Sequence, residues 1–238
     1  MKLTLLEKAL AASRAGRAAV LATNLQSGLQ SLLEGTEFAG ELPLDAAALA
    51  AIRTAVREDR SKIVDTALGP VFVEVFNPKL RCIIVGAVHI AQPLARMATL
   101  TGYLVTVVDP RTAFASDERF PDMGLSTDWP DEAMEKLKPN RRTAIVTLTH
   151  DPKLDDPALA AALRSDAFYI GALGSKKTHA TRLKRLERLG FTEAQMARIH
   201  GPVGLDIGAI SPAEIAIAIM AEITQVLRAE PESGREAA

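Results

Sequence analysis

Cysteine and aromatic residues are scarce in this chain of 238 residues. Cys82 is the only cysteine, which excludes an intrachain disulfide framework and a cysteine-rich zinc site, and fits a reducing compartment. Aromatic residues make up 4% of the chain against 48% hydrophobic residues in all, so the core must be mainly aliphatic. The 28 Lys and Arg residues nearly balance the 29 Asp and Glu residues. Net charge therefore gives no reason to expect nucleic acid or an anionic membrane as a partner.

Long apolar runs are also missing. The apolar stretch 215–223 is too short to span a bilayer and carries Glu214 and Glu222. The first residues lack the apolar core and cleavage site of a signal peptide. We therefore expect a cytoplasmic protein with no membrane contact.

Two parts of the chain differ in pattern. Residues 1–77 indicate a small α+β domain, with helices near 3–14 and 45–58 and strands near 18–23, 62–65 and 71–76. Asn77-Pro78 is a plausible boundary, because proline favours an extended residue before it. Residues 78–230 form the second predicted domain, and the polar residues 231–238 are expected to fray.

Strands and helices alternate in the second domain. The apolar runs expected to form strands are 81–85, 103–108, 143–149 and 167–172, and helices are expected near 89–101, 156–164, 177–189 and 212–228. Such alternation is typical of a parallel sheet covered by helices on both faces. The predicted fold class is therefore α/β, with a Rossmann-like doubly wound parallel sheet and the small N-terminal domain.

Three of the four histidines stand in short motifs of small residues after predicted strands, and the fourth opens a glycine-rich segment. They are His89, His150, His179 and His200. Because open α/β sheets bind ligands at their carboxyl edge, these imidazoles predict one polar site there. No pair of ligands at helical spacing supports a metal site, and Cys82 lies in mid-strand, so no metal ligand or catalytic residue is assigned.

The turn at Gly86 resembles a dinucleotide-binding turn only in part. Asp109 follows it at the spacing of the acid that holds a ribose, but Val88 stands where the fingerprint needs a second glycine. Gly86 then either makes only the strand-to-helix turn or takes part in tight binding of NAD. Asp109 and Arg111 could both face the cleft, or could form a local salt bridge.

Further along, three motifs add polar groups. Asp151 could orient His150 or could serve as a turn residue. The segment 171–179 exposes backbone amides to an anion through its small residues, and Lys176 and Lys177 add charge. Basic residues continue onto the helix as far as Arg188, and several of them are expected to form only its solvated face. Asp206 in the segment 200–209 is either a polar contact or a carboxylate at a helix entry. The predicted ligand-binding set is Gly86, His89, Asp109, Arg111, His150, Gly171, Gly174, Ser175, Lys176, His179, His200 and Asp206.

Residues from about 80 to 226 resemble the Rossmann domain of the xanthine dehydrogenase accessory factors, the XdhC/CoxI family. The resemblance rests on ordered segments: 84–89, 107–111, 119–121, 148–151, 169–175 with 178–179, and 198–209. Residues 16–23 resemble the beginning of the family's N-terminal domain, and residues 73–76 resemble its final strand. The middle is shortened and its cysteine motif is absent, which indicates a divergent member.

This resemblance implies a molybdenum-cofactor chaperone and not chiefly an enzyme. Such a protein would bind molybdopterin as cargo, hold it for sulfuration by a cysteine desulfurase and help to insert it into a xanthine dehydrogenase-type client; a homodimer is also implied. Two alternatives stay open: an NAD(P)-dependent oxidoreductase, and a scaffold or regulatory paralogue without cargo. Whether a nucleotide also binds is left open.

Overall fold

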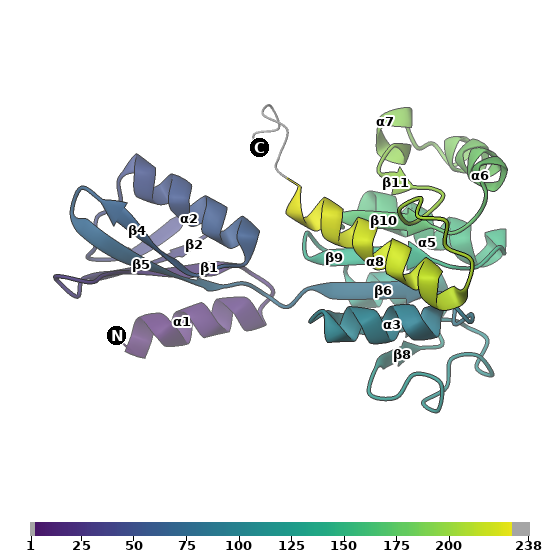
Figure 1. Cartoon of the computed structure of the whole chain (residues 1–238), viewed down its shortest axis with the longest axis horizontal. Helices are drawn as coiled ribbons and strands as arrows, with labels where there is room; N and C mark the ends of the chain where they lie inside the picture. Colours follow the sequence, from purple (N-terminus) through teal and green to yellow (C-terminus); the bar gives the residue numbers. More distant parts are fainter. Residues whose placement is uncertain (1–2, 230–238) are drawn as a thin grey trace. The chain divides into compact units, whose positions relative to one another are not determined.

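The computed structural model describes residues 3–229, which divide after Lys79 into two compact units. The expected frayed tail, 231–238, lies outside the described residues. In the first unit five antiparallel strands lie in the order β3-β2-β1-β5-β4 (Figure 1). Their bounds are Ala19–Asn24 for β1, Gln30–Glu34 for β2, Glu37–Gly40 for β3, Lys62–Thr66 for β4 and Gly69–Phe76 for β5. The hairpin of β2 and β3 was not predicted.

One helix covers each face of this antiparallel sheet. The side chains of β1 alternate, so Leu21 packs against α1 (Leu3–Arg14) and Val20 packs against α2 (Ala46–Glu58). The predicted start of α2 is confirmed, because the Asp45 side chain accepts a hydrogen bond from the Ala48 amide at 2.7 Å.

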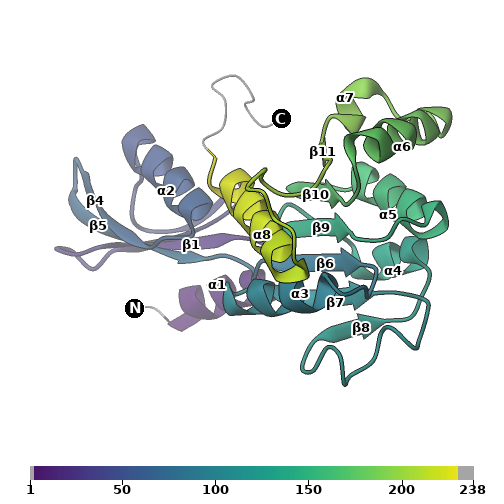
Figure 2. The same cartoon turned by 45° about the vertical axis from the view of Figure 1, so that its right-hand side comes forward.

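The second unit contains a six-stranded parallel sheet, so the predicted Rossmann-like fold is confirmed. The strand order is β11-β10-β9-β6-β7-β8, and the arrows run in one direction in Figure 2. Their bounds are Arg81–Val85 for β6, Leu104–Val108 for β7, Gly124–Ser126 for β8, Thr143–Thr147 for β9, Tyr169–Ala172 for β10 and Ile199–His200 for β11. In chain order this is the 3-2-1-4-5-6 arrangement of a dinucleotide-binding sheet.

Helices cover both faces of the parallel sheet. On one face α3 (Ala91–Leu100) and α8 (Pro212–Arg228) lie side by side (Figures 1 and 2). The other face packs against α4 (Pro130–Leu137), α5 (Pro152–Arg164) and α6 (Lys176–Arg188), and the short α7 (Glu193–Met196) follows. Ser211 and Glu214 form a capping box at the predicted start of α8. Across residues 3–229 no helix combines the length and apolar character that a membrane span requires.

Candidate functional site

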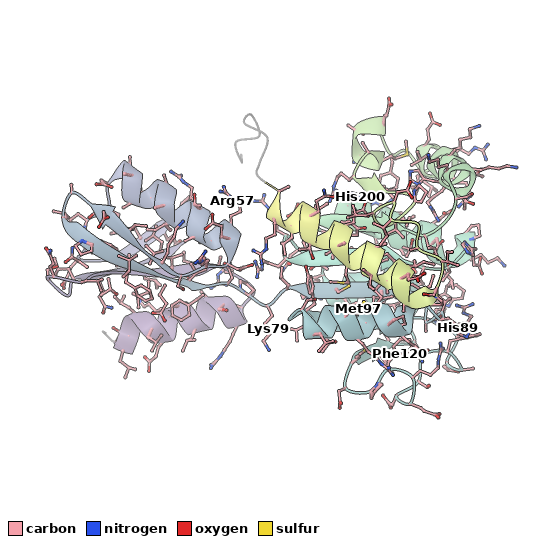
Figure 3. All side chains as sticks on the ribbon, in the orientation of Figure 1. Arg57, Lys79, His89, Met97, Phe120 and His200 are labelled. Carbon is pink, nitrogen blue, oxygen red and sulfur yellow. The ribbon has the colours of Figure 1, made fainter. Side chains whose placement is uncertain are left out.

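Strand order creates a switch point between β6 and β9, where a sheet of this kind opens a crevice at its carboxyl edge. The turns that follow these two strands touch. Gly86 has φ +102°, and a Cβ atom there would overlap the methyl group of Thr149. Glycine at this position therefore satisfies both backbone conformation and close packing. Figure 3 shows His89 at this edge, by the amino end of α3, and His150 directly follows Thr149; both imidazoles are exposed.

The turn after β6 is not arranged to hold a phosphate. Its Ala87 amide donates to Asp109 Oδ2 at 2.8 Å, so this N–H does not face a ligand. Val88 is partly buried and packs against the core. At the cap of α3, the Ile90 side chain makes no hydrogen bond. The structure gives Gly86 the turn-forming role that was one of its two predicted interpretations.

Asp109 forms a salt bridge with Arg111, which decides between the two interpretations of this pair. The Asp109 side chain is 0% exposed, and Arg111 contacts it through Nε at 2.8 Å and Nη2 at 2.7 Å. Burial raises the pKa of Asp109, but the hydrogen bonds from Arg111 and from the Ala87 amide outweigh burial and hold the pKa below its usual value. The expectation that the Asp109 carboxylate lines the cleft is therefore corrected.

Arg111 remains at the rim, since its side chain is 42% exposed. The hydrogen bond to Asp109 raises the pKa of Arg111, and the negative charge of Asp151 raises it further. The residues that follow β7 and β9 therefore interact electrostatically. The Arg111 guanidinium also stacks 4.7 Å from the ring centroid of Phe114. Arg119 donates to the carbonyl oxygen atoms of Ala87, at 2.8 Å, and Phe114, at 2.6 Å, which secures this loop to the turn after β6.

Ser175 starts α6 at the end of β10. Its hydroxyl accepts a hydrogen bond from the Thr178 amide at 3.1 Å, and Gly174 before it has φ +142°. Lys176 and Lys177 are exposed in the first turn. The amides of the first helical turn lack intrahelical acceptors and carry the positive end of the helix dipole. This turn can receive an anion.

His179 lies over the loop that follows β11. A Cβ atom on Gly201 would overlap its imidazole ring, so glycine makes room for the ring. The Nδ1 atom of His179 is buried and has no hydrogen-bond partner among the described residues. Burial first, and the charge of Arg182 second, lower the pKa of His179, which keeps the imidazole neutral at neutral pH.

A buried network that sequence reasoning missed lies under the ends of β9 and β10. Asp155 accepts a hydrogen bond from Thr149 Oγ1 at 2.5 Å, and Arg182 Nη2 lies 3.4 Å from Asp155 Oδ2. Arg182 Nη2 also donates to the Leu173 carbonyl oxygen at 2.7 Å. The Arg182 side chain is 1% exposed, so this residue is not among the basic residues that form the solvated helix face. The signal was available: Arg182 precedes the buried Leu186 by one helical turn.

His200 belongs to a separate cluster against α8, as Figure 3 shows. The Glu222 carboxylate receives the Tyr169 hydroxyl at 2.5 Å and the Gly204 amide at 2.8 Å, and lies 3.2 Å from His200 Nδ1. The rings of His200 and Tyr169 stack, with 4.7 Å between their centroids. Burial raises the pKa of Glu222, but hydrogen bonds from His200 and Tyr169 prevail and lower it overall. This cluster fixes the loop after β11 to α8.

The predicted set thus divides by exposure. The exposed members are His89, Arg111, His150, Ser175, Lys176 and Asp206; Gly174, His179 and His200 are partly buried; Gly86, Asp109 and Gly171 are buried. Gly171 has a packing role, since a side chain there would meet Val203 and Tyr169. Asp151 caps α5 by accepting from the Lys153 amide at 2.9 Å, as its turn interpretation predicted. Within residues 3–229 no three His, Cys, Asp or Glu side chains are grouped as metal ligands.

Comparison with known proteins identifies the second unit. The XdhC Rossmann domain matches residues 82–223. The molybdenum cofactor insertion chaperone PaoD of Escherichia coli is 33% identical over 151 residues, which cover 63% of this chain and 41% of PaoD. A probable xanthine dehydrogenase subunit of Bacillus subtilis is 35% identical over 155 residues, 65% of this chain and 45% of that protein.

A solved structure extends the likeness to both units. A Bacillus halodurans protein described as a xanthine dehydrogenase has a TM-score of 0.70 and 25% identity, covering 97% of this chain and 66% of its own. The chain spans less than half the length of the two curated relatives named above. With a family match over more than half of its residues, the chain belongs to the XdhC family.

Proposed function

We propose that this chain is a chaperone that carries the molybdenum cofactor and helps to insert it into a xanthine dehydrogenase-type hydroxylase. The observation that carries this proposal is the XdhC Rossmann domain at 82–223, together with the resemblance to PaoD, a molybdenum cofactor insertion chaperone. The chain covers 41% of PaoD.

The carboxyl edge of the parallel sheet supports a binding role. It carries the exposed imidazoles of His89 and His150, the Arg111 guanidinium and the amino end of α6. These groups donate hydrogen bonds and positive charge, which suits an anionic pterin. Cargo held mainly by hydrogen bonds and charge can be released to a client without breaking strong metal–protein bonds.

The proposal includes sulfuration of the cargo by a cysteine desulfurase before insertion. The thiol of Cys82 is unsuited to carrying sulfur from the desulfurase to the cargo. Cys82 is 0% exposed, and burial raises the pKa of its thiol to about 12. The sulfur would therefore pass directly to the bound cargo. A homodimer, implied by the family resemblance, is part of the same proposal.

The Asp109–Arg111 pair disfavours the oxidoreductase alternative. In a nucleotide-binding sheet the acid at the end of the second strand accepts hydrogen bonds from ribose hydroxyls. Here both carboxylate oxygen atoms are already engaged and the side chain is 0% exposed. Ribose binding would require this salt bridge to open.

Retention under anaerobic conditions tests the proposal. The full chain is incubated with freshly released molybdenum cofactor or with NADH, desalted, and assayed for molybdenum, pterin and nicotinamide. We expect molybdenum and pterin together in a fixed ratio to protein, with less retention in the double variant His89→Ala/His150→Ala. The matched control is Arg188→Gln, which changes an exposed residue at the far end of α6. NADH retained without pterin would support the oxidoreductase; retention of neither would support the scaffold.

A further inference from the structure

The usual phosphate position of a dinucleotide-binding sheet is closed in this protein. That position is the turn after the first strand, here β6. The Ala87 amide in this turn is engaged by Asp109, and the open face of Gly86 is filled by Thr149. Val88 adds a branched side chain in the same turn. An oxyanion bound at the carboxyl edge must find its donors elsewhere.

The turn between β10 and α6 supplies those donors. Ser175 uses its hydroxyl to cap the Thr178 amide, which leaves the amides of Lys176 and Lys177, the first two helical residues, pointing out of the helix. Both lysine side chains are exposed in the same turn. α6 has 13 residues, so its dipole is fully developed at this end.

Arg182 adds an independent observation beneath this turn. Its side chain is 99% buried, yet Nε and Nη1 have no hydrogen-bond partner among residues 3–229. Its Nη2 atom holds the Leu173 carbonyl oxygen and lies 3.8 Å from the position of a Cβ atom on Gly174. A buried guanidinium with unused donors is costly unless a further partner or a negative charge compensates it.

The carboxylates nearby offset this charge only in part. Asp155 accepts hydrogen bonds from both Thr149 and Arg182, and its 3.4 Å distance from Arg182 Nη2 is long for a charge-assisted hydrogen bond. Asp156 is engaged by Arg185 through Nε at 2.5 Å and Nη2 at 2.8 Å. Lys176 and Lys177 form no ion pair with any described residue. The turn is left with an excess of positive charge.

We propose that the amino end of α6 is a phosphate-monoester site, in which the Lys176 and Lys177 amides and ammonium groups bind the phosphate and Arg182 positions the turn. The assignment rests on the proposed function, since the phosphate is taken to be the one at the end of the pterin cargo. Arg182 acts by fixing the Leu173 carbonyl, which orients Gly174 and Ser175, and by adding buried positive charge.

Calorimetric titration of the full chain with inorganic phosphate tests this site. A second titration uses flavin mononucleotide and riboflavin, two flat heterocycles that differ only by a phosphate monoester. We expect phosphate to bind and to compete with flavin mononucleotide, while riboflavin binds at least about tenfold more weakly. The double variant Lys176→Gln/Lys177→Gln should weaken phosphate binding about tenfold. Arg182→Met should do the same, with partial rescue in Arg182→Lys.

Lys184→Gln is the matched control, because Lys184 is exposed on the same helix but lies beyond its first turns. Its phosphate affinity should stay within about twofold of the unchanged chain. No phosphate binding by the unchanged chain, or an equal loss in Lys184→Gln, would overturn the site. If Arg182→Met does not fold, the lysine double variant decides alone, since it changes only exposed side chains. A chain that retains molybdenum cofactor but does not bind phosphate would contradict this site and leave the proposed function standing. A chain that binds phosphate but does not retain molybdenum cofactor would support the anion site and contradict the proposed function.

Discussion

Arg111 holds Asp109 with two nitrogen atoms, Nε 2.8 Å from Oδ1 and Nη2 2.7 Å from Oδ2. The same carboxylate accepts the Ala87 amide from the turn after β6. The Asp109 carboxylate therefore joins the ends of β6 and β7. In a related dinucleotide-binding sheet the equivalent carboxylate binds the ribose, whereas here it stabilises the edge of the sheet.

Replacing Arg111 should destabilise the second unit. In Arg111→Met the Asp109 carboxylate stays buried with only backbone donors, and we expect a loss of about 3 kcal/mol in the free energy of unfolding. Trp129, the only tryptophan, lies in this unit, so its fluorescence in urea reports the transition. Arg188→Gln should change the result by less than about 0.5 kcal/mol. Equal stability of Arg111→Met and the unchanged chain would show that the salt bridge is not a structural element.

Gly201 and His179 should be energetically coupled. In Gly201→Ala the new methyl group overlaps the imidazole, and we expect a loss of about 2 kcal/mol. In a chain that already carries His179→Ala the same change should cost less than about 1 kcal/mol, because the ring is gone. Urea unfolding of the two single variants and the double variant gives the coupling energy. Strictly additive losses would contradict the packing of the ring on this loop.

The raised pKa of Asp155 should make the folded protein more stable as the pH falls toward about 4. Burial raises its pKa to about 6, while hydrogen bonding from Thr149 and the charge of Arg182 act in the opposite direction. Because this pKa lies above the value of about 3.9 in an unfolded chain, the native state binds the proton more tightly. Its contribution to the free energy of unfolding therefore grows as the pH falls from about 7 to 4, by up to about 3 kcal/mol.

Comparison of the unchanged chain with Asp155→Asn isolates this effect. The lowered pKa of His179 works in the opposite direction over part of the same range, but it does so in both proteins. Thermal unfolding between about pH 4.5 and 7.5 should show the stability advantage of the unchanged chain over Asp155→Asn growing toward low pH. Parallel curves would mean that Asp155 titrates normally.

Cys82 should be inert in the folded protein. Its thiol is buried in β6, and burial raises its pKa to about 12, so almost no thiolate forms at neutral pH. We expect Ellman's reagent to release less than about a tenth of an equivalent from the native chain and a full equivalent in denaturant. Rapid reaction of the native protein would contradict the placement of this strand.

Local signals predicted much of the fold. Asp45 and Ser211 start their helices as their sequence positions suggested, and β6, β7 and β9 were predicted because each is an apolar run. The strands β8 and β11 were missed, since they have three and two residues and exist only through pairing with a neighbour. The segment 130–137, which forms α4, was also not predicted.

The candidate site could be predicted in its location but less well in its contacts. Strand ends placed His89 and His150 at one edge, because parallel strands share that edge. Sequence spacing alone could not decide whether Asp109 faces ligand or Arg111, which depends on the direction of one side chain. It also could not reveal Asp155 and Arg182 as a pair, because these residues are 27 positions apart and meet only through packing of α5 on α6.

Delivery of cargo to a client enzyme is the strongest test of the proposed chaperone role. The full chain is loaded anaerobically with sulfurated molybdenum cofactor, desalted, and mixed with the apo form of a xanthine dehydrogenase-type hydroxylase whose activity is then followed. We expect the loaded chain to activate the apo-enzyme more completely than the same amount of free cofactor, and molybdenum to leave the chain as activity appears. Activation no better than with free cofactor, with molybdenum still bound to the chain, would contradict it.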